Sequence, residues 1–199
     1  AVRAHRKVVM KRRVRQISRS IAEVLPEEVI TVLDVGSGTG EIAQAVNSLR
    51  PELSFTGVDV YIRQKTFIPI VKYNGYTLPF DDEVFDAVTI VDVLHDCTDP
   101  VSVLKACARV SKQWVLIKDH VSDSFYDEKV LKFMDWGGNR SHGVVLPYNY
   151  LSTSEWKSAF TKAGLESTIN INQLRLYPMP FDILFGGRLH CFRLLQKIT

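Results

Sequence analysis

The chain has 199 residues, of which 46% are hydrophobic and 24% are charged, proportions typical of one globular domain with a substantial core. Its apolar runs fall short of the roughly 18 residues of a membrane helix, and the first residues lack the apolar core of a signal peptide. Three scattered cysteines, Cys97, Cys107 and Cys191, exclude a disulfide framework, a zinc ribbon and a thiolate-held iron–sulfur cluster. We therefore expect a cytoplasmic protein with reduced thiols and no bound metal.

Residues 1–25 are predicted to form a basic amphipathic helix. The first 19 residues contain eight lysines and arginines and no acid, leaving 17 basic against 22 acidic residues in the rest of the chain. Apolar residues recur every three or four positions, at Met10, Val14, Ile17, Ile21 and Val24, so one stripe should be buried beneath a cationic outer face. This face is either simply solvated or drawn to anionic lipid head groups as a peripheral contact. The segment has no aromatic side chains that could stack on bases, which argues against nucleic acid.

From residue 26 onward, β-type and helical runs alternate without repeats or linkers, which is typical of a parallel sheet with crossover helices. We predict strands at 31–35, 54–59, 68–73, 85–91 and 113–118, and helices at 40–49, 100–110, 124–135 and 153–163. Residues 165–176 and 189–198 should be two further strands that pair antiparallel, because no helix lies between them. Residues 60–67 and 74–84 are too short for long crossover helices. The pattern predicts an α/β fold, with one Rossmann-like domain over 26–199: a doubly wound, mostly parallel sheet with a C-terminal antiparallel strand pair.

The first predicted strand leads into a turn with three alternate glycines: Gly36, Gly38 and Gly40. Glycines let the backbone turn sharply and approach a ligand, and the N-terminus of the next helix offers unpaired N–H groups. Asp59 closes the second predicted strand about twenty residues later, where a carboxylate can accept both hydroxyls of a ribose. A nicotinamide-dependent dehydrogenase shares these two features, but its G-x-G-x-x-G pattern needs a glycine where this chain has Glu41.

Four motifs in the expected order resemble those of class I S-adenosylmethionine-dependent methyltransferases, and more narrowly the quinone-biosynthesis-type branch that acts on small molecules. They are the glycine-rich turn, Asp59, the run Leu78-Pro79-Phe80 with Phe85-Asp86, and Val91-Asp92-Val93-Leu94-His95. The resemblance covers residues 25–120. It implies S-adenosylmethionine as cofactor and direct methyl transfer to a small acceptor, aromatic and lipid-linked compounds included.

The resemblance also implies which residues contact the cofactor. The methionine part would lie among Asp34, Gly36, Ser37, Gly38 and Gly40, with Asp59 on the ribose and Val60 against the adenine. Asn74 stands where the family usually has an aspartate that accepts from the adenine amino group, and an amide oxygen can accept the same bond. Gly75 would donate its backbone N–H to the ring edge. Asp92 would lie near the cofactor's amino group or the substrate.

Methyl transfer needs alignment of the acceptor, the methyl carbon and the sulfur, with a base where the acceptor must lose a proton. Histidine titrates near neutral pH, so a histidine beyond the fourth or fifth strand is the natural candidate. His95 follows the fourth predicted strand, and Asp119-His120 directly follow the fifth. His95 and His120 are therefore candidate bases, and Asp119 either orients a histidine or caps the next helix.

The segment from Met134 to Tyr150 is too long and too aromatic for a simple spacer. Loops over a rigid sheet commonly carry substrate contacts, so we interpret it as a substrate lid, with a packed structural loop as the alternative. The candidate substrate-binding residues are Trp136, Asn139, Arg140, His142, Tyr148 and Tyr150.

Two other functions are also compatible with the sequence. A non-catalytic protein that binds S-adenosylmethionine would explain the lack of a decisive base, and a methyltransferase that acts on RNA would explain the cationic first helix.

Overall fold

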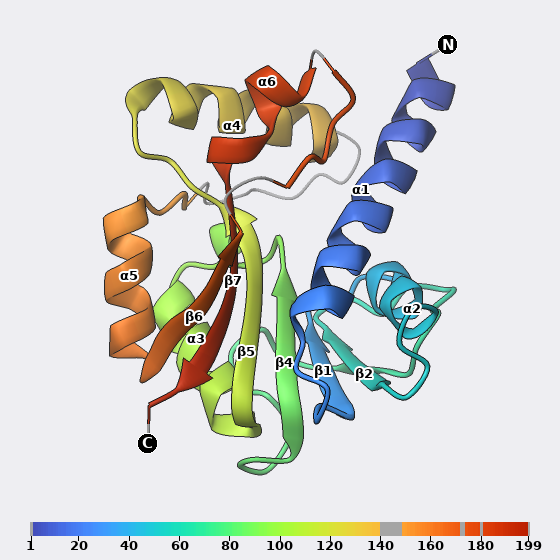
Figure 1. Cartoon of the computed structure of the whole chain (residues 1–199), viewed down its shortest axis with the longest axis vertical. Helices are drawn as coiled ribbons and strands as arrows, with labels where there is room; N and C mark the ends of the chain where they lie inside the picture. The colour runs from blue at the N-terminus through green and yellow to red at the C-terminus, as the bar shows by residue number, and fades with distance from the viewer. Residues whose placement is uncertain (1, 140–148, 172–173, 180, 199) are drawn as a thin grey trace.

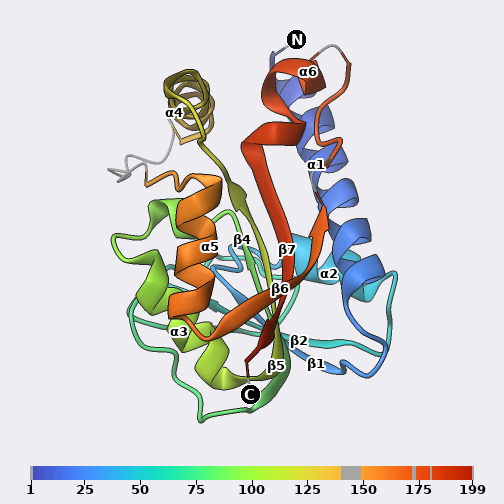
Figure 2. The same cartoon turned by 60° about the vertical axis from the view of Figure 1, so that its left-hand side comes forward.

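The computed structural model describes residues 2–139, 149–171, 174–179 and 181–198. At its centre these residues form a seven-stranded sheet in the order β3-β2-β1-β4-β5-β7-β6. Helices α1 and α2 cover one face of the sheet and helices α3 and α5 cover the other (Figures 1 and 2).

The strands are β1 (Thr31–Val35), β2 (Ser54–Asp59), β3 (Ile70–Lys72), β4 (Phe85–Val91), β5 (Ser111–His120), β6 (Leu165–Ile171) and β7 (His190–Lys197). Strands β1 to β5 pair in parallel, and β7 runs antiparallel to both of its neighbours, β5 and β6. The predicted doubly wound, mostly parallel sheet with a C-terminal antiparallel pair is confirmed. The strand order reverses between β1 and β4, the position at which open α/β sheets bind ligands.

The helices are α1 (Val2–Val24), α2 (Glu41–Asn47), α3 (Pro100–Val110), α4 (Phe125–Asn139), α5 (Thr153–Lys162) and α6 (Phe181–Phe185), with short 3₁₀ turns η1 (Leu94–Asp96) and η2 (Gly187–Leu189). Local sequence sets several of their ends. Asp99 caps α3 by accepting the N–H of Ser102 at 3.0 Å, and Ser152 with Glu155 forms a reciprocal capping box at the start of α5.

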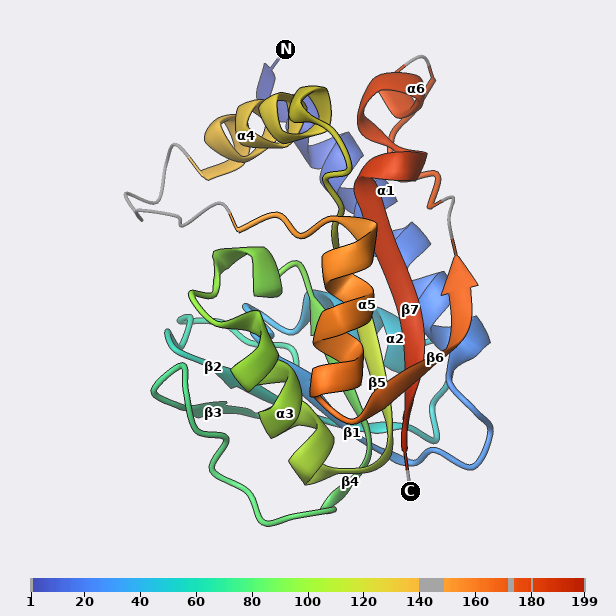
Figure 3. The same ribbon diagram turned by 90° about the vertical axis from the view of Figure 1, so that its left-hand side faces the viewer.

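Helix α1 is only partly covered by the rest of the domain. Ile17 and Ile21 are buried against the sheet and α2, and Arg50 donates to the carbonyl of Leu25 at 2.6 Å just beyond the helix. Met10, which we expected in the buried stripe, is 44% exposed. The reason is that the N-terminal half of α1 runs past the end of the sheet (Figure 3).

Several element boundaries differ from the sequence prediction, and three of the differences have a clear cause. Strand β5 continues through Asp119 and His120, because β7 pairs with it as far as His190. Helix α4 continues to Asn139, because the chain has no proline to stop it before Pro147. Strand β6 ends at Ile171, and the leucines that extended the predicted strand, Leu174 and Leu176, are instead buried in the core beyond it.

Candidate functional site

The glycine-rich turn has a backbone that other residues adopt only with strain. Gly36, Gly38 and Gly40 have φ angles of 70°, 59° and 76°, all in the left-handed region. A Cβ at Gly36 would lie 2.3 Å from Cγ2 of Val93, whereas a Cβ at Gly38 would meet no atom within 4 Å. The turn is therefore packed tightly against the segment after β4 at Gly36 and is open at Gly38.

Two acidic residues lie beside this turn at the ends of β1 and β2. Asp59 accepts the N–H of Gly38 at Oδ2 and the N–H of Tyr61 at Oδ1, both at 2.8 Å. Asp34 is buried and accepts the hydroxyl of Thr89 at 2.8 Å. Burial raises the pKa of Asp34 to about 7, the Thr89 hydrogen bond opposes that change, and the charge of Asp59 adds to it. Near neutral pH, the Asp34 carboxyl is thus partly protonated.

The expected adenine contacts lie on two neighbouring turns. A Cβ at Gly75 would come within 3.3 Å of Cγ1 of Val60, so these two turns touch. The oxygen of Asn74 accepts the N–H groups of Tyr76 and Thr77 at 2.9 and 2.8 Å. Both acceptor positions of this oxygen are therefore occupied within its own turn.

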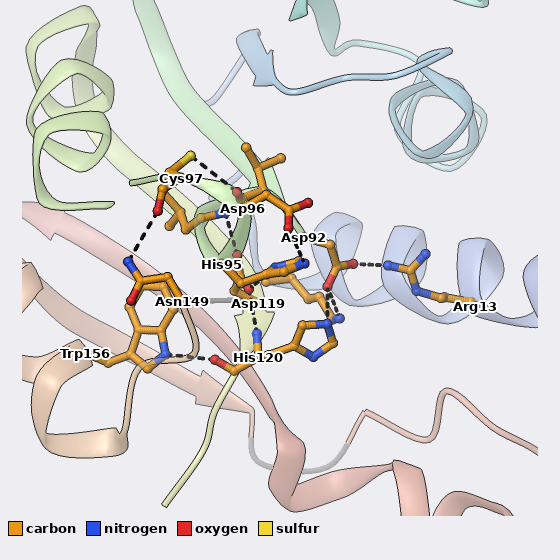
Figure 4. Close-up of polar contacts among 12 residues, drawn as sticks. Arg13, Asp92, His95, Asp96, Cys97, Asp119, His120, Asn149 and Trp156 are labelled. Atoms are coloured by element: carbon orange, nitrogen blue, oxygen red, sulfur yellow. Dashed lines mark hydrogen bonds and ion pairs between the residues drawn. The ribbon is translucent and has the colours of Figure 1, made fainter. Parts of the chain in front are cut away.

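Asp92 follows β4 and is held by cations from two distant elements (Figure 4). Its carboxylate pairs with Arg13 of α1 through Oδ2 and with the fully buried Lys118 of β5 through Oδ1. Although burial raises the pKa of Asp92, the charges of Arg13 and Lys118 hold it well below its ordinary value. The sequence predicted Asp92 beside a ligand, but in this structure both of its oxygens are engaged by protein cations.

His95 lies in η1 and forms a buried pair with Asp119. Its Nδ1 is 2.7 Å from Asp119 Oδ1, and the same carboxylate accepts the N–H groups of Leu94 and His120 at 2.8 and 2.7 Å. Burial lowers the pKa of His95, but the charge of Asp119 and its hydrogen bond outweigh burial and raise it to about 9. His95 therefore holds its proton at neutral pH, and Asp119 contacts a histidine rather than capping the helix that follows it in the chain.

His120 and His190 face each other across β5 and β7. Their ring centroids are 5.2 Å apart, and the ring of His95 is 4.7 Å from that of His120. Burial, followed by the charge of Lys118, lowers the pKa of both rings well below 6.5, so both are neutral. Within the described part of the chain, the buried Nδ1 atoms of His120 and His190 have no hydrogen-bond partner.

Among the candidate substrate contacts, Tyr150 reaches this cluster. Its ring centroid is 6.0 Å from those of His95 and His120, and the preceding Asn149 N–H donates to the carbonyl of His95 at 2.9 Å. Trp136 and Asn139 fall in the last turns of α4, which corrects their assignment to a loop. Arg140, His142 and Tyr148 lie outside the described residues.

Sequence reasoning missed three residues of this site. Arg13 was one of eight basic residues in a segment expected to face outward. Lys118 did leave a signal, a single lysine at the end of the apolar run 114–117. The position of His190 beside His120 can be predicted only when the register of β7 against β5 is known.

Comparison with known proteins gives the family of this chain. A family model described as a methyltransferase domain matches residues 5–168. A demethylmenaquinone methyltransferase from Thermotoga maritima is 28% identical over 156 residues, which are 70% of this chain and 67% of that protein. A ubiquinone/menaquinone biosynthesis C-methyltransferase from Cupriavidus metallidurans is 26% identical over 142 residues, which cover 62% of this chain and 58% of the relative's length.

Solved structures show the same fold. An S-adenosylmethionine-dependent methyltransferase from Thermotoga maritima superimposes with a TM-score of 0.69 at 20% identity, over 96% of this chain and 92% of that one. The YcgJ protein of Bacillus subtilis has a TM-score of 0.63 at 18% identity, over 92% and 98% of the two chains. None of these findings favours a dehydrogenase, a non-catalytic binding protein or an RNA methyltransferase. The chain belongs to the class I S-adenosylmethionine-dependent methyltransferases.

Proposed function

We propose that this chain transfers a methyl group from S-adenosylmethionine to a small, flat acceptor of the quinone type, held beside His95, His120 and Tyr150. One contact carries the proposal: Gly36 of the glycine-rich turn packs directly on Val93, and Val93 immediately precedes the turn that carries His95. A ligand on the glycine-rich turn and an acceptor against the histidine rings would therefore be neighbours.

The residues present fit the cofactor. The open side of Gly38 leaves room for the methionine part, Asp59 ends β2 with a carboxylate suited to ribose hydroxyls, and Val60 with Gly75 offers an apolar surface for the adenine. Asp34, Ser37 and Gly40 complete the surroundings of the methionine part. When bound, S-adenosylmethionine supplies a reactive methyl group on a positively charged sulfur.

The acceptor class follows from the rings that would surround it. His95, His120 and Tyr150 present aromatic faces and edges within about 6 Å of one another, and an aromatic acceptor gains from packing against such rings. The names of the two relatives, a demethylmenaquinone methyltransferase and a ubiquinone/menaquinone methyltransferase, support a quinone-type compound.

The protonation states of His95 and His120 give the two residues different roles in methyl transfer. His95 is an imidazolium at neutral pH, with Asp119 fixing its ring through Nδ1 and Asp96 Oδ1 lying 3.6 Å from its Nε2, so an acceptor oxygen would share the Nε2–H with Asp96. His120 is neutral, so it can accept the acceptor's proton, directly or through one water, as the new bond to the methyl carbon forms. Asp92 is held in ion pairs with Arg13 and Lys118, so we do not assign it the role of base.

The proposal is tested by calorimetry with S-adenosylmethionine and by transfer of a labelled methyl group to a short-chain demethylated naphthoquinol. We expect binding and label in the quinol. Failure to bind millimolar cofactor would overturn the proposal. Binding without label in any phenol or quinol would support the non-catalytic alternative instead.

We also propose that the chain works in the cytoplasm and that α1 makes a peripheral contact with anionic membrane surfaces. Lys11, Arg15 and Arg19 follow one another at four-residue spacing on the exposed side of α1, which supports attraction to negatively charged head groups.

A further inference from the structure

Helix α4 presents an unusual outward face. Its inward side buries Asp127 and Leu131, whereas Phe125, Lys129 and Phe133 follow at four-residue spacing on the exposed side. Phe125 is 72% exposed. A surface helix normally turns polar residues outward, so an outward aromatic stripe indicates that this face meets something other than water.

A second exposed apolar segment lies at the same end of the molecule. Met179 and Leu184 are 70% and 54% exposed, and Leu184 belongs to α6. All three ribbon views place α4, α6 and the N-terminal half of α1 together beyond the carboxyl ends of the parallel strands (Figures 1, 2 and 3). This is also the end at which the histidine cluster lies.

The aromatic side chains of this end are accompanied by cations. Nζ of Lys129 lies 4.4 Å from the ring centroid of Phe125, and the guanidinium of Arg188, which also pairs with Asp127 at 2.9 Å, lies 5.9 Å from that of Tyr126. Aromatic rings flanked by lysine and arginine are typical of a surface at a lipid–water boundary, where the rings enter the head-group layer and the cations meet phosphates. The exposed Lys11, in the N-terminal half of α1, adds charge of the same sign.

A bilayer explains these features better than RNA or a protein partner. The first 19 residues carry eight basic residues and no acid. This diffuse positive charge complements an anionic lipid surface, but it does not define a binding site for one particular protein. Aliphatic side chains such as Met179 and Leu184 contribute nothing to stacking on bases. Within the described ranges, no helix is long and apolar enough to cross a membrane, so contact would be made by lying on the surface.

We propose that the outward face of α4, Met179 with helix α6, and the N-terminal half of α1 form a lipid-docking rim that rests on an anionic bilayer. The rim surrounds the end of the sheet that holds the histidine cluster, so a lipid-linked acceptor could pass from the head-group layer to the rings without its tail crossing water. Only this last step rests on the proposed function; binding of the rim to lipid requires neither cofactor nor acceptor.

The test is flotation of the whole chain with vesicles of phosphatidylglycerol and phosphatidylcholine, compared with vesicles of phosphatidylcholine alone. We expect binding to the anionic vesicles, and its loss at high salt, because screening shortens the reach of the basic residues. The double variant Phe125→Ser with Leu184→Ser should bind about tenfold more weakly or worse, because apolar side chains add to interfacial affinity.

The matched control is the double variant Ile30→Ser with Val84→Ser. Both are exposed apolar residues, Ile30 at 46%, and they precede β1 and β4 at the opposite end of the sheet. This control should bind vesicles as the wild type does, and thermal melting should show that all variants are folded. The rim proposal is wrong if the two double variants lose affinity equally, if neither does, or if the chain binds RNA but not anionic vesicles.

A water-soluble short-chain quinol assayed without vesicles separates the two proposals. Turnover of that quinol by the Phe125→Ser, Leu184→Ser variant at the wild-type rate, with weakened vesicle binding, is the expected result. If the wild-type chain does not methylate this quinol, the proposed function is refuted and the rim proposal is unaffected.

Discussion

Replacing Asp119 with asparagine removes a negative charge from beside His95 and keeps the shape of the side chain. Burial alone would lower the pKa of His95, and the Asp119 charge with its 2.7 Å hydrogen bond raises it to about 9. Without that charge, burial, the largest cause, is opposed only by the smaller contributions of the Asp96 and Asp92 charges. We therefore expect the pKa of His95 in Asp119→Asn to fall below its ordinary value of 6.5, which leaves the ring neutral at pH 7.

The same change alters how stability depends on pH. A pKa of about 9 in the folded chain against 6.5 in the unfolded chain corresponds to about 3 kcal/mol of tighter proton binding by the folded state. This contribution is complete below pH 6.5, decreases as the pH rises toward about 9, and is absent above it. The wild type should lose about 3 kcal/mol of unfolding free energy from this residue across that range, and Asp119→Asn should not show the loss.

Two measurements check this reasoning. An NMR titration of the histidine Cε1–H signals gives the pKa of His95 in both proteins, and urea unfolding at a series of pH values gives the stability difference. His120 is the internal control, because burial keeps its pKa well below 6.5. If His95 titrated near 6.5 in the wild type, or if Asp119→Asn left its pKa unchanged, the Asp119–His95 charge pair would not exist as described.

Further predictions concern the cofactor turn and the proposed base. Asp59→Ala should weaken S-adenosylmethionine binding by about 1–3 kcal/mol, because the ribose hydroxyls and the Gly38 N–H lose their acceptor; calorimetry measures this, and the exposed Asp81→Ala should leave the affinity unchanged. His120→Ala should lower turnover by about 10²–10⁴ and leave cofactor affinity intact, whereas equal loss of both would mean structural damage. Gly164→Ala, at a left-handed position with no atom near the new Cβ, should cost about 1 kcal/mol of stability. Gly36→Ala should cost about 1–3 kcal/mol more than that, because its Cβ would collide with Val93, and chemical denaturation of the two variants compares them. Methyl transfer by the wild type should decline above about pH 9 as His95 loses its proton; an unchanged rate there would show that the imidazolium is not needed.

Much of the fold could be predicted because its information is local. Apolar runs gave the five parallel strands, Ser152 and Glu155 gave the start of α5, and the lack of a helix between the last two strands gave their antiparallel pairing. The errors arose where tertiary contacts determine how far a strand extends. Asp119 and His120 belong to β5 because β7 pairs with them, and Leu174 and Leu176 were assigned to a strand because buried residues give the same apolar pattern outside a sheet.

The positions of the candidate site residues were predictable where one strand end or one turn defines a residue. Asp34, Asp59, Asp92 and Asp119 all lie at ends of parallel strands, which meet at one edge of the sheet by topology. Protonation states were not predictable, because they depend on partners distant in sequence. The charge on His95 depends on Asp119, 24 positions away, and the neutrality of His120 depends on its burial and on Lys118. The contact of Arg13 with Asp92 spans 79 positions, so no local pattern could reveal it.

The placement of β7 between β5 and β6 has a consequence for how the chain folds. The strand that follows all the others in sequence fills an interior position of the sheet, and the same site contains Arg13 from the first helix and His190 from that last strand. Contacts between such distant segments form slowly, because long loops must close first. During synthesis at about 5–20 residues per second, β5 would expose its edge until residue 190 has emerged, which is a period of risk for wrong strand pairing. The histidine cluster is therefore complete only once β7 has paired with β5, and incomplete chains should have no activity.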